Sequence, residues 1–318
     1  MGYDYELVFS GERVITSGID YVVSDTFPSV YYTIGHGEEK LPDSIVSSLE
    51  TDNVSCSSLS IATEGKIPND CSLIVINTPM SDISDKELAI LEDYLSSGGR
   101  LMLITSHRYT ELKNLLSVAE DFGLTKDDGI IAEPEGDRLF SDDPSDILPI
   151  TKNADSYLSL GAHYLIMPKS HPIKKTESAE NGELEASVSY TDLFVTSSES
   201  YILTEDDEKG EAEKSSFAVA VLAKSDDSAL LWISSEDFLD PSVNTSSAGG
   251  NFIYAVALIE DLCDKKSPFS IASKILVEPS LTINSTQSGF WATVIIVIIP
   301  LAFVGVGVYI YRKRKNAK

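Results

Sequence analysis

The sequence predicts an α/β protein with a doubly wound, mostly parallel sheet that is interrupted by an irregular, β-containing insertion. Strand-like apolar runs alternate with amphipathic helical segments at least three times between residues 29 and 132, which is typical of βαβ units. The runs at 72–77 and 101–105 are almost continuously apolar, as expected for strands covered on both faces. Runs of the same kind return at 217–223 and 229–234.

The beginning of the chain, residues 1–28, predicts a strand at 5–9 and a short helix at 14–23 whose apolar residues recur on one side. The first thirty residues contain no apolar run able to act as a signal peptide or a first membrane span. We therefore expect this region to continue a longer upstream part of the protein.

Residues 29–132 predict the α/β core. Pro42 suits the first position of a helix, and Ser84 and Glu87 have the spacing of a capping box at the start of another. Gly98 and Gly99 end that second helix, since glycine adopts the left-handed conformation without a side-chain clash. The other expected elements are strands at 29–34, 54–61, 72–77, 101–105 and 130–132 and helices at 42–49 and 109–122.

Residues 133–215 break this pattern. Proline, aspartate and serine are dense there, hydrophobic runs are short, and 204–214 is a charge run typical of an exposed loop. We expect an irregular insertion with some β structure. The α/β core then resumes at 216–263, and residues 264–289 predict a polar juxtamembrane linker.

The chain closes with a candidate membrane span at 290–311. This segment has no charged residue, and roughly 20 apolar helical residues cross a bilayer core. Aromatic residues stand near both ends, where the interfaces favour them, and Pro300 is tolerated within a span. The tail at 312–318 is basic, which favours the cytoplasmic side. We therefore expect a transmembrane helix of a single-pass cell-membrane protein, with the bulk of the chain outside the cytoplasm.

The part of the chain before this segment is strongly acidic. All 50 acidic residues but only 19 of the 24 basic residues lie there, which leaves it with a formal net charge of −31. Such a surface repels nucleic acid, so no nucleic-acid partner is expected, whereas a cation or a basic partner stays open. Cys56, Cys71 and Cys263 are too few and too scattered for a disulfide framework or a zinc site.

The best candidate site is the loop formed by Gly35, His36, Gly37 and Glu38. A histidine and a carboxylate at the carboxyl end of a strand can perform acid–base chemistry or help to hold a metal. They are too few to make a metal site alone, so a tight turn anchored by hydrogen bonds is the plainer interpretation. The turn is still a candidate for binding a ligand or a partner. We predict no catalytic residue, no cofactor and no metal.

A hydrolase is the enzymatic alternative. It would use loops at 35–38, 78–83 and 106–108, with Ser106 and His107 as candidate reactive groups, and it would require His36, Glu38, Ser106 and His107 to converge in one pocket. An amidotransferase would need a cysteine nucleophile on the turn after the strand at 101–105, and the sequence has none there.

The remaining histidines and the nucleotide motifs give little support for catalysis. His163 and His171 lie in the irregular region and are expected to be surface or turn residues. The sequence contains no phosphate loop and no GxGxxG motif after a strand, so neither ATP hydrolysis nor dinucleotide binding is predicted.

Several stretches in combination resemble the GldG-like family, whose members are auxiliary components of ABC-type transport systems first linked to gliding motility. The apolar close of the chain with its RKRK tail matches as well. The stretches are YYTIGHGE at 31–38, IPNDCSLIVINTP at 67–79, SDKELAILEDYLSSGGRLMLIT at 84–105, SALLWISSEDFLD at 228–240 and GGNFIYAVALIEDL at 249–262.

This resemblance implies a fold similar to class I glutamine amidotransferases, which is flavodoxin-like, in a domain outside the cytoplasm. It also implies a non-catalytic accessory subunit of an ABC-type transport system. The expected partners are an ABC ATPase, a multi-span permease and the lipid bilayer through 290–311, with self-association as a further possibility. A carbohydrate- or polymer-binding surface domain without a transporter is a third interpretation.

Overall fold

The computed structural model describes most of the chain between residues 8 and 265 and parts of the C-terminal segment. It divides into two compact units, residues 10–272 and a second unit of residues 1–9 with 273–318. The described residues are 8–9, 11–24, 27–109, 111–134, 136–152, 164–181, 188–203, 214–265, 274–275, 293–301, 303, 305 and 312.

The smaller unit contains a short antiparallel pair, β1 (Val8–Phe9) with β16 (Lys274–Ile275). It also contains a π-helical stretch, η3 (Val294–Ile298). Among the residues that the structure describes, no helix combines the length and the apolar character needed to cross a bilayer. Much of the expected span, including 290–292 and 306–311, lies outside the described residues, as does most of the strand expected at 5–9.

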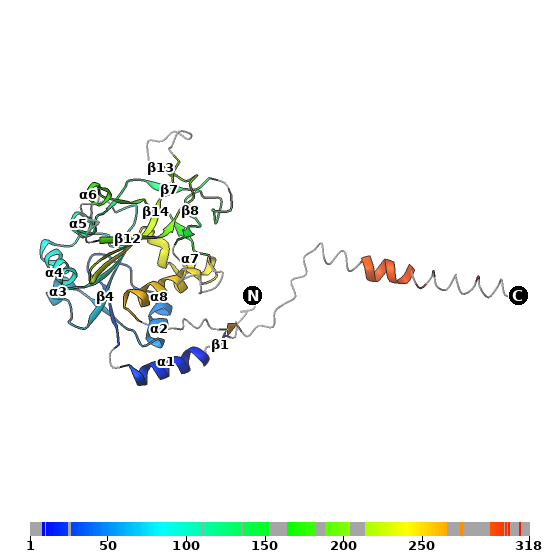
Figure 1. The fold of residues 1–318 in the computed structure, drawn as a ribbon, viewed down its shortest axis with the longest axis horizontal. Helices are drawn as coiled ribbons and strands as arrows, with labels where there is room; N and C mark the ends of the chain where they lie inside the picture. The colour runs from blue at the N-terminus through cyan, green and yellow to red at the C-terminus, as the bar shows by residue number, and fades with distance from the viewer. Residues whose placement is uncertain are drawn as a thin grey trace. The chain divides into compact units, whose positions relative to one another are not determined.

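The larger unit is built on a mixed, mostly parallel sheet (Figure 1). In the described chain its strands run in the order β3-β2-β4-β5-β15-β14-β11-β6. From β3 to β15 every neighbouring pair is parallel. From β15 to β6 every pair is antiparallel. The strands are β2 (Ser29–Thr33), β3 (Ser55–Leu59), β4 (Cys71–Asn77), β5 (Arg100–Ile104), β6 (Leu124–Lys126), β11 (Ile173–Lys175), β14 (Ala218–Ser225) and β15 (Ser228–Ile233).

Helices cover both faces of this sheet. On one face α2 (Asp43–Thr51) packs beside α8 (Gly250–Leu262), and on the other α4 (Asp85–Ser96) lies between α3 (Ile61–Glu64) and α5 (Lys113–Asp121). Successive side chains of a strand point to opposite faces. Leu73 and Val75 of β4 therefore join the α2–α8 core, while Ile74 and Ile76 join the α4–α5 core. The central strands β4 and β5 are covered on both sides, and their sequences are therefore almost continuously apolar, as predicted.

The core elements lie close to their predicted bounds, and the capping box is confirmed. The Ser84 side chain accepts a hydrogen bond from Glu87 N, and the Glu87 carboxylate accepts one from Ser84 N. Gly98 then ends α4 with φ of 93°. The short helix of the first segment is α1 (Gly11–Val23).

The segment expected to be an insertion contributes directly to the main sheet. Within it, β12 (Val188–Val195) pairs along most of its length with β14, and β11 pairs with both β14 and β6. A partner strand distant in sequence supplies these hydrogen bonds, so hydrophobic periodicity gives little sign of them. The other short elements are β7 (Ile130–Ala132), β8 (Asp146–Ile147), β9 (Ile150–Thr151), β10 (Met167–Pro168), β13 (Tyr201–Leu203), α6 (Glu177–Glu180), η2 (Glu236–Leu239) and α7 (Pro241–Ser246).

The capping box gives the first testable prediction. Ser84→Ala removes the acceptor for Glu87 N, so we expect the free energy of unfolding to fall by about 1 kcal/mol. Urea denaturation followed by circular dichroism measures this. Ser96→Ala, an exposed position in the last turn of the same helix, is the matched control and should change stability by less than about 0.5 kcal/mol. Equal effects of the two substitutions would contradict the role given to Ser84.

Candidate functional site

The carboxyl edge of the parallel strands is where the topology favours a site. The strand that follows β2 in the chain, β3, lies on one side of β2, and the next one, β4, lies on the other. In open α/β sheets, ligands bind outside the carboxyl ends of the strands where the strand order reverses in this way. The loop after β2 and the loop after β4 flank this point.

The loop after β2 is held closed against the loop after β4. The His36 carbonyl accepts hydrogen bonds from Met80 N at 2.9 Å and from Ser81 N at 3.0 Å. Gly37 has φ of 81°, and a Cβ there would lie 2.9 Å from the Met80 Cβ. Glycine is therefore required both by the backbone conformation and by the close approach of Met80.

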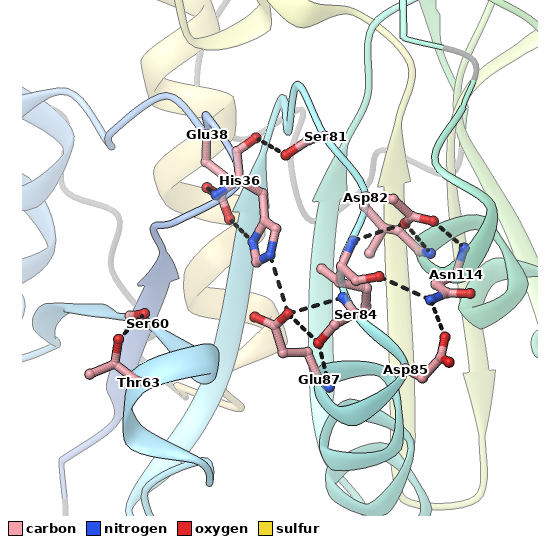
Figure 2. A network of polar contacts seen from close by, with 12 residues as sticks. His36, Glu38, Ser60, Thr63, Ser81, Asp82, Ser84, Asp85, Glu87 and Asn114 are labelled. Atoms are coloured by element: carbon pink, nitrogen blue, oxygen red, sulfur yellow. Dashed lines mark hydrogen bonds and ion pairs between the residues drawn. The ribbon is translucent and has the colours of Figure 1, made fainter.

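The His36 imidazole lies between two carboxylates, as Figure 2 shows. Its Nδ1 is 3.4 Å from Glu38 Oε1, and its Nε2 is 3.3 Å from Glu87 Oε2. The backbone N–H of His36 also donates to Glu38 Oε2 at 2.6 Å. The side chains of Glu38 and Glu87 are only 1% and 5% exposed. The histidine therefore joins the loop after β2 to the start of α4.

Glu87 is stabilised in its charged form. Burial alone would raise the pKa of this carboxyl group, but hydrogen bonds from Ser84 and the nearby His36 outweigh burial and lower the pKa below its ordinary value. Its position in the first turn of α4 also favours negative charge. The carboxylate is thus a fixed acceptor at the helix start.

A second polar group occupies the same edge after β5 and β15. Ser106 Oγ donates to Glu236 Oε2 at 2.5 Å, and Arg108 N donates to Ser106 Oγ at 3.0 Å. Arg108 Nε lies 3.2 Å from Glu236 Oε1, close enough for an ion pair although not in hydrogen-bond geometry. Ser106 is 1% exposed. The hydroxyl is thus bonded to a carboxylate but buried, whereas a nucleophile must be reachable by its substrate.

Lys126 holds the loop after β5 through hydrogen bonds to its backbone carbonyls. Its ammonium donates to the Ser106 carbonyl at 2.8 Å and to the Tyr109 carbonyl at 3.3 Å. Burial lowers the Lys126 pKa to about 8, against the opposing attraction of nearby carboxylates. Burial likewise lowers the pKa of His107. These shifts arise from packing around the loop.

A fully buried chain of hydrogen bonds, which we call the buried relay, joins Trp232, Thr105 and His171. Trp232 Nε1 donates to Thr105 Oγ1 at 2.8 Å, and Thr105 Oγ1 lies 2.7 Å from His171 Nε2. His171 Nδ1 lies 3.1 Å from the Pro172 carbonyl. Since a carbonyl only accepts, Nδ1 carries the proton and Nε2 accepts from the threonine hydroxyl. Burial lowers the pKa of His171 to about 3, so this imidazole is neutral.

The residues of the hydrolase alternative fall into these two groups. His36 bonds to Glu38 and Glu87, and Ser106 bonds to Glu236; within the described residues no hydrogen bond or ion pair joins one group to the other. His107 lies beside Ser106 in the chain, yet its Nδ1 has no hydrogen-bond partner in the described structure.

The other sequence candidates have mixed outcomes. His171 lies in the short connection between β10 and β11, but the expectation of a surface position is wrong: it is 0% exposed, and Thr105 and the Pro172 carbonyl bond to its two ring nitrogens. His163 lies outside the described residues. Burial raises the pKa of Cys56 and Cys71 to about 11 and that of Cys263 to about 12, so these thiols stay protonated. In the described chain no cluster of three or more His, Cys, Asp or Glu side chains could hold a metal.

Three residues of the edge were not identified from the sequence: Glu236, Lys126 and Thr105. Glu236 follows β15 as Ser106 follows β5, so its signal was a polar residue shortly after a buried strand. That signal becomes specific only once β5 and β15 are known to be parallel neighbours. Lys126 has no such signal, because its partners are backbone carbonyls.

Comparisons with known proteins give a fold and no family. No protein-family model matches the chain, and no curated protein matches it. The N-terminal domain of mmIFT52 has a similar structure, with a TM-score of 0.53 at 12% identity over 74% of this chain and 96% of that one. At this identity the likeness shows a shared fold only.

Weaker structural likenesses include a ThuA-like protein from Bacteroides uniformis, with a TM-score of 0.43 at 14% identity over 73% of this chain and 89% of that one. A GMP synthase subunit from Thermoplasma acidophilum has a TM-score of 0.38 at 8% identity over 76% and 96%. Proteins of the glutamine amidotransferase-like type are thus among the matches at low identity, with scores too low to support an argument. None of these matches names a GldG-like protein.

The buried relay gives the second prediction. Thr105→Val leaves Trp232 Nε1 and His171 Nε2 without partners, so we expect the free energy of unfolding to fall by about 2–4 kcal/mol. Thr33→Val is the matched control, because Thr33 is 5% exposed and its hydroxyl has no partner among the described residues. That substitution should be neutral or stabilising. Comparable losses in the two variants would refute the relay.

The neutral His171 gives the third prediction, on pH. Between pH 6.5 and about 3 the unfolded chain binds a proton on this imidazole that the folded chain does not, so stability falls as pH falls. We expect His171 to account for a loss of about 2 kcal/mol between pH 7 and pH 5. Urea denaturation of the natural chain and of His171→Gln at both pH values isolates this part. An identical pH dependence in both proteins would show the assignment to be wrong.

Proposed function

We propose that the chain is a non-catalytic accessory subunit of an ABC-type transport system, fixed in the cell membrane by residues 290–311 with its domain outside the cytoplasm. The non-catalytic part of this proposal is supported by the hydrogen bonds and ion pairs at the carboxyl edge. There two candidate reactive side chains have partners inside the domain. His36 lies between two buried carboxylates, and the Ser106 hydroxyl donates a hydrogen bond to Glu236.

The chemistry of the cysteines supports the same proposal. A glutamine amidotransferase-like enzyme would act through a thiolate. All three cysteines of the sequence have raised pKa values because of burial. None follows β5, where Thr105 and Ser106 stand. A domain of this fold whose cysteines stay protonated is better suited to binding a partner than to thiolate catalysis.

The transport assignment rests on the sequence resemblance, and the membrane anchor rests on the uncharged segment before the basic tail. The carboxyl edge is the surface that we propose for the partner. Met80 is 52% exposed beside the loop after β2, and an exposed apolar residue over a rigid loop is a suitable contact.

Co-purification tests the proposal, as the fourth prediction. We expect a mild-detergent pull-down of the full chain, analysed by mass spectrometry, to recover an ABC ATPase and its permease. Met80→Glu should reduce that recovery, because it places a charge on the proposed contact. Ser96→Glu adds the same charge at an exposed site in the last turn of α4, near the opposite edge, and should leave recovery unchanged.

Two results would count against the proposal. Recovery of the chain alone, under conditions that preserve a known ABC complex, would reject the accessory-subunit role. Recovery of the ATPase and permease with equal loss in both variants would retain that role and reject the carboxyl edge as the contact.

A further inference from the structure

Helix α1 turns its apolar side away from the domain. Ile15, Ile19 and Val22 are 67%, 60% and 82% exposed. Residues spaced four and then three apart lie on one face of a helix. An amphipathic helix of a globular domain normally packs this face onto the core, so its outward orientation requires another explanation.

The polar side of α1 is the side that binds the domain. Ser17 Oγ donates to the Thr51 carbonyl at the end of α2. Asn53 Nδ2 donates to the Ser17 carbonyl at 2.9 Å, and Lys265 Nζ lies 3.7 Å from Asp20 Oδ2. These contacts come from α2, the turn after it and the short stretch after α8. They fix the rotation of α1 about its axis and leave the aliphatic face outside.

From Ile15 to Val23 the outward face carries no charge. Between residues 15 and 23, Asp20 is the only charged residue, and it is on the domain side with Asn53 and Lys265. The protein as a whole has a formal net charge of −26. An uncharged, aliphatic face is therefore a local exception on a strongly acidic molecule.

Helix α1 lies at the amino edge of the sheet, beside the last described residue of the domain. A cavity of about 560 Å³ is lined by Asp20 and Phe27 together with Asp70, Ser72 and Cys263, so α1 lies at the amino edge of the sheet, near the start of β4. Lys265, which pairs with Asp20, is the last described residue of this unit. Twenty-four residues then lead to the uncharged segment that starts at Phe290.

We propose that the Ile15–Ile19–Val22 face of α1 lies on the surface of a lipid bilayer. The proposal rests on the proposed function, because the bilayer is the one that residues 290–311 would cross. Lys265, which lies beside α1, is the last described residue of the domain before that segment in the sequence. Between residues 15 and 23 the face is apolar and uncharged, as is the buried face of an interfacial helix.

This arrangement would orient the domain. With α1 on the bilayer, the loops after β2, β4 and β5 at the other edge of the sheet would face away from it. The carboxyl edge would then be open to a partner, while the span and α1 together would restrict rotation of the domain over the membrane.

Site-directed fluorescence on the full chain tests this, as the fifth prediction. The three natural cysteines are replaced by alanine, and single cysteines at Ile19→Cys or Val22→Cys are labelled with an environment-sensitive fluorophore. Glu92→Cys, exposed on α4 across the sheet, is the matched control, and Val297→Cys reports on the anchor. The proteins are reconstituted into phosphatidylcholine vesicles with and without spin-labelled phosphatidylcholine.

We expect a blue-shifted emission and several-fold quenching by the spin-labelled lipid at positions 19 and 22, with no change at 92. Quenching at 297 but not at 19 or 22 would overturn this inference and leave the membrane anchor intact. Absence of quenching at 297 would reject the anchor separately. A disulfide-linked dimer through Ile19→Cys, without lipid quenching, would show that a second copy covers the face and would overturn the inference.

Discussion

The parallel register of β5 between β4 and β15 determines the rest of the carboxyl edge. Thr78 N donates to the Ile104 carbonyl, and Thr105 N donates to the Ile233 carbonyl. The three strands consequently end level with one another. This alignment places Thr105 against Trp232 and brings Ser106 to Glu236 across the neighbouring strand ends. Residues 130 apart in the chain meet there only because the strands are paired in this register.

Burial then decides the chemistry of that edge. A polar group removed from water must find a hydrogen-bond partner or lose stability, and here the partners are other side chains of the edge. His36 satisfies Glu38 and Glu87, Thr105 satisfies Trp232 and His171, and Lys126 satisfies backbone carbonyls. These bonds hold the loops after β2 and β5 in place.

The sequence could predict whatever depends on local pattern. The buried strands β4 and β5 appear as apolar runs, and the capping box of Ser84 and Glu87 appears as a spacing, because both are properties of neighbouring residues. His171 could not be placed, since its burial depends on Thr105 and Trp232, two residues from other parts of the chain. β12 was missed for the same reason: its ladder with β14 is a tertiary pairing, and its half-buried pattern resembles that of a loop.

The two edges of the sheet have opposite characters, and this difference follows from which side chains find partners inside the domain. At the carboxyl edge, His36, Ser106 and Thr105 have partners inside the domain, and Met80 is exposed. At the amino edge, the polar side of α1 is satisfied by Thr51, Asn53 and Lys265, which forces its aliphatic side outward. Apolar surface exposed in this way costs free energy in water unless something covers it. The hydrogen bonds that hold α1 in place are thus the reason the proposed membrane contact can exist.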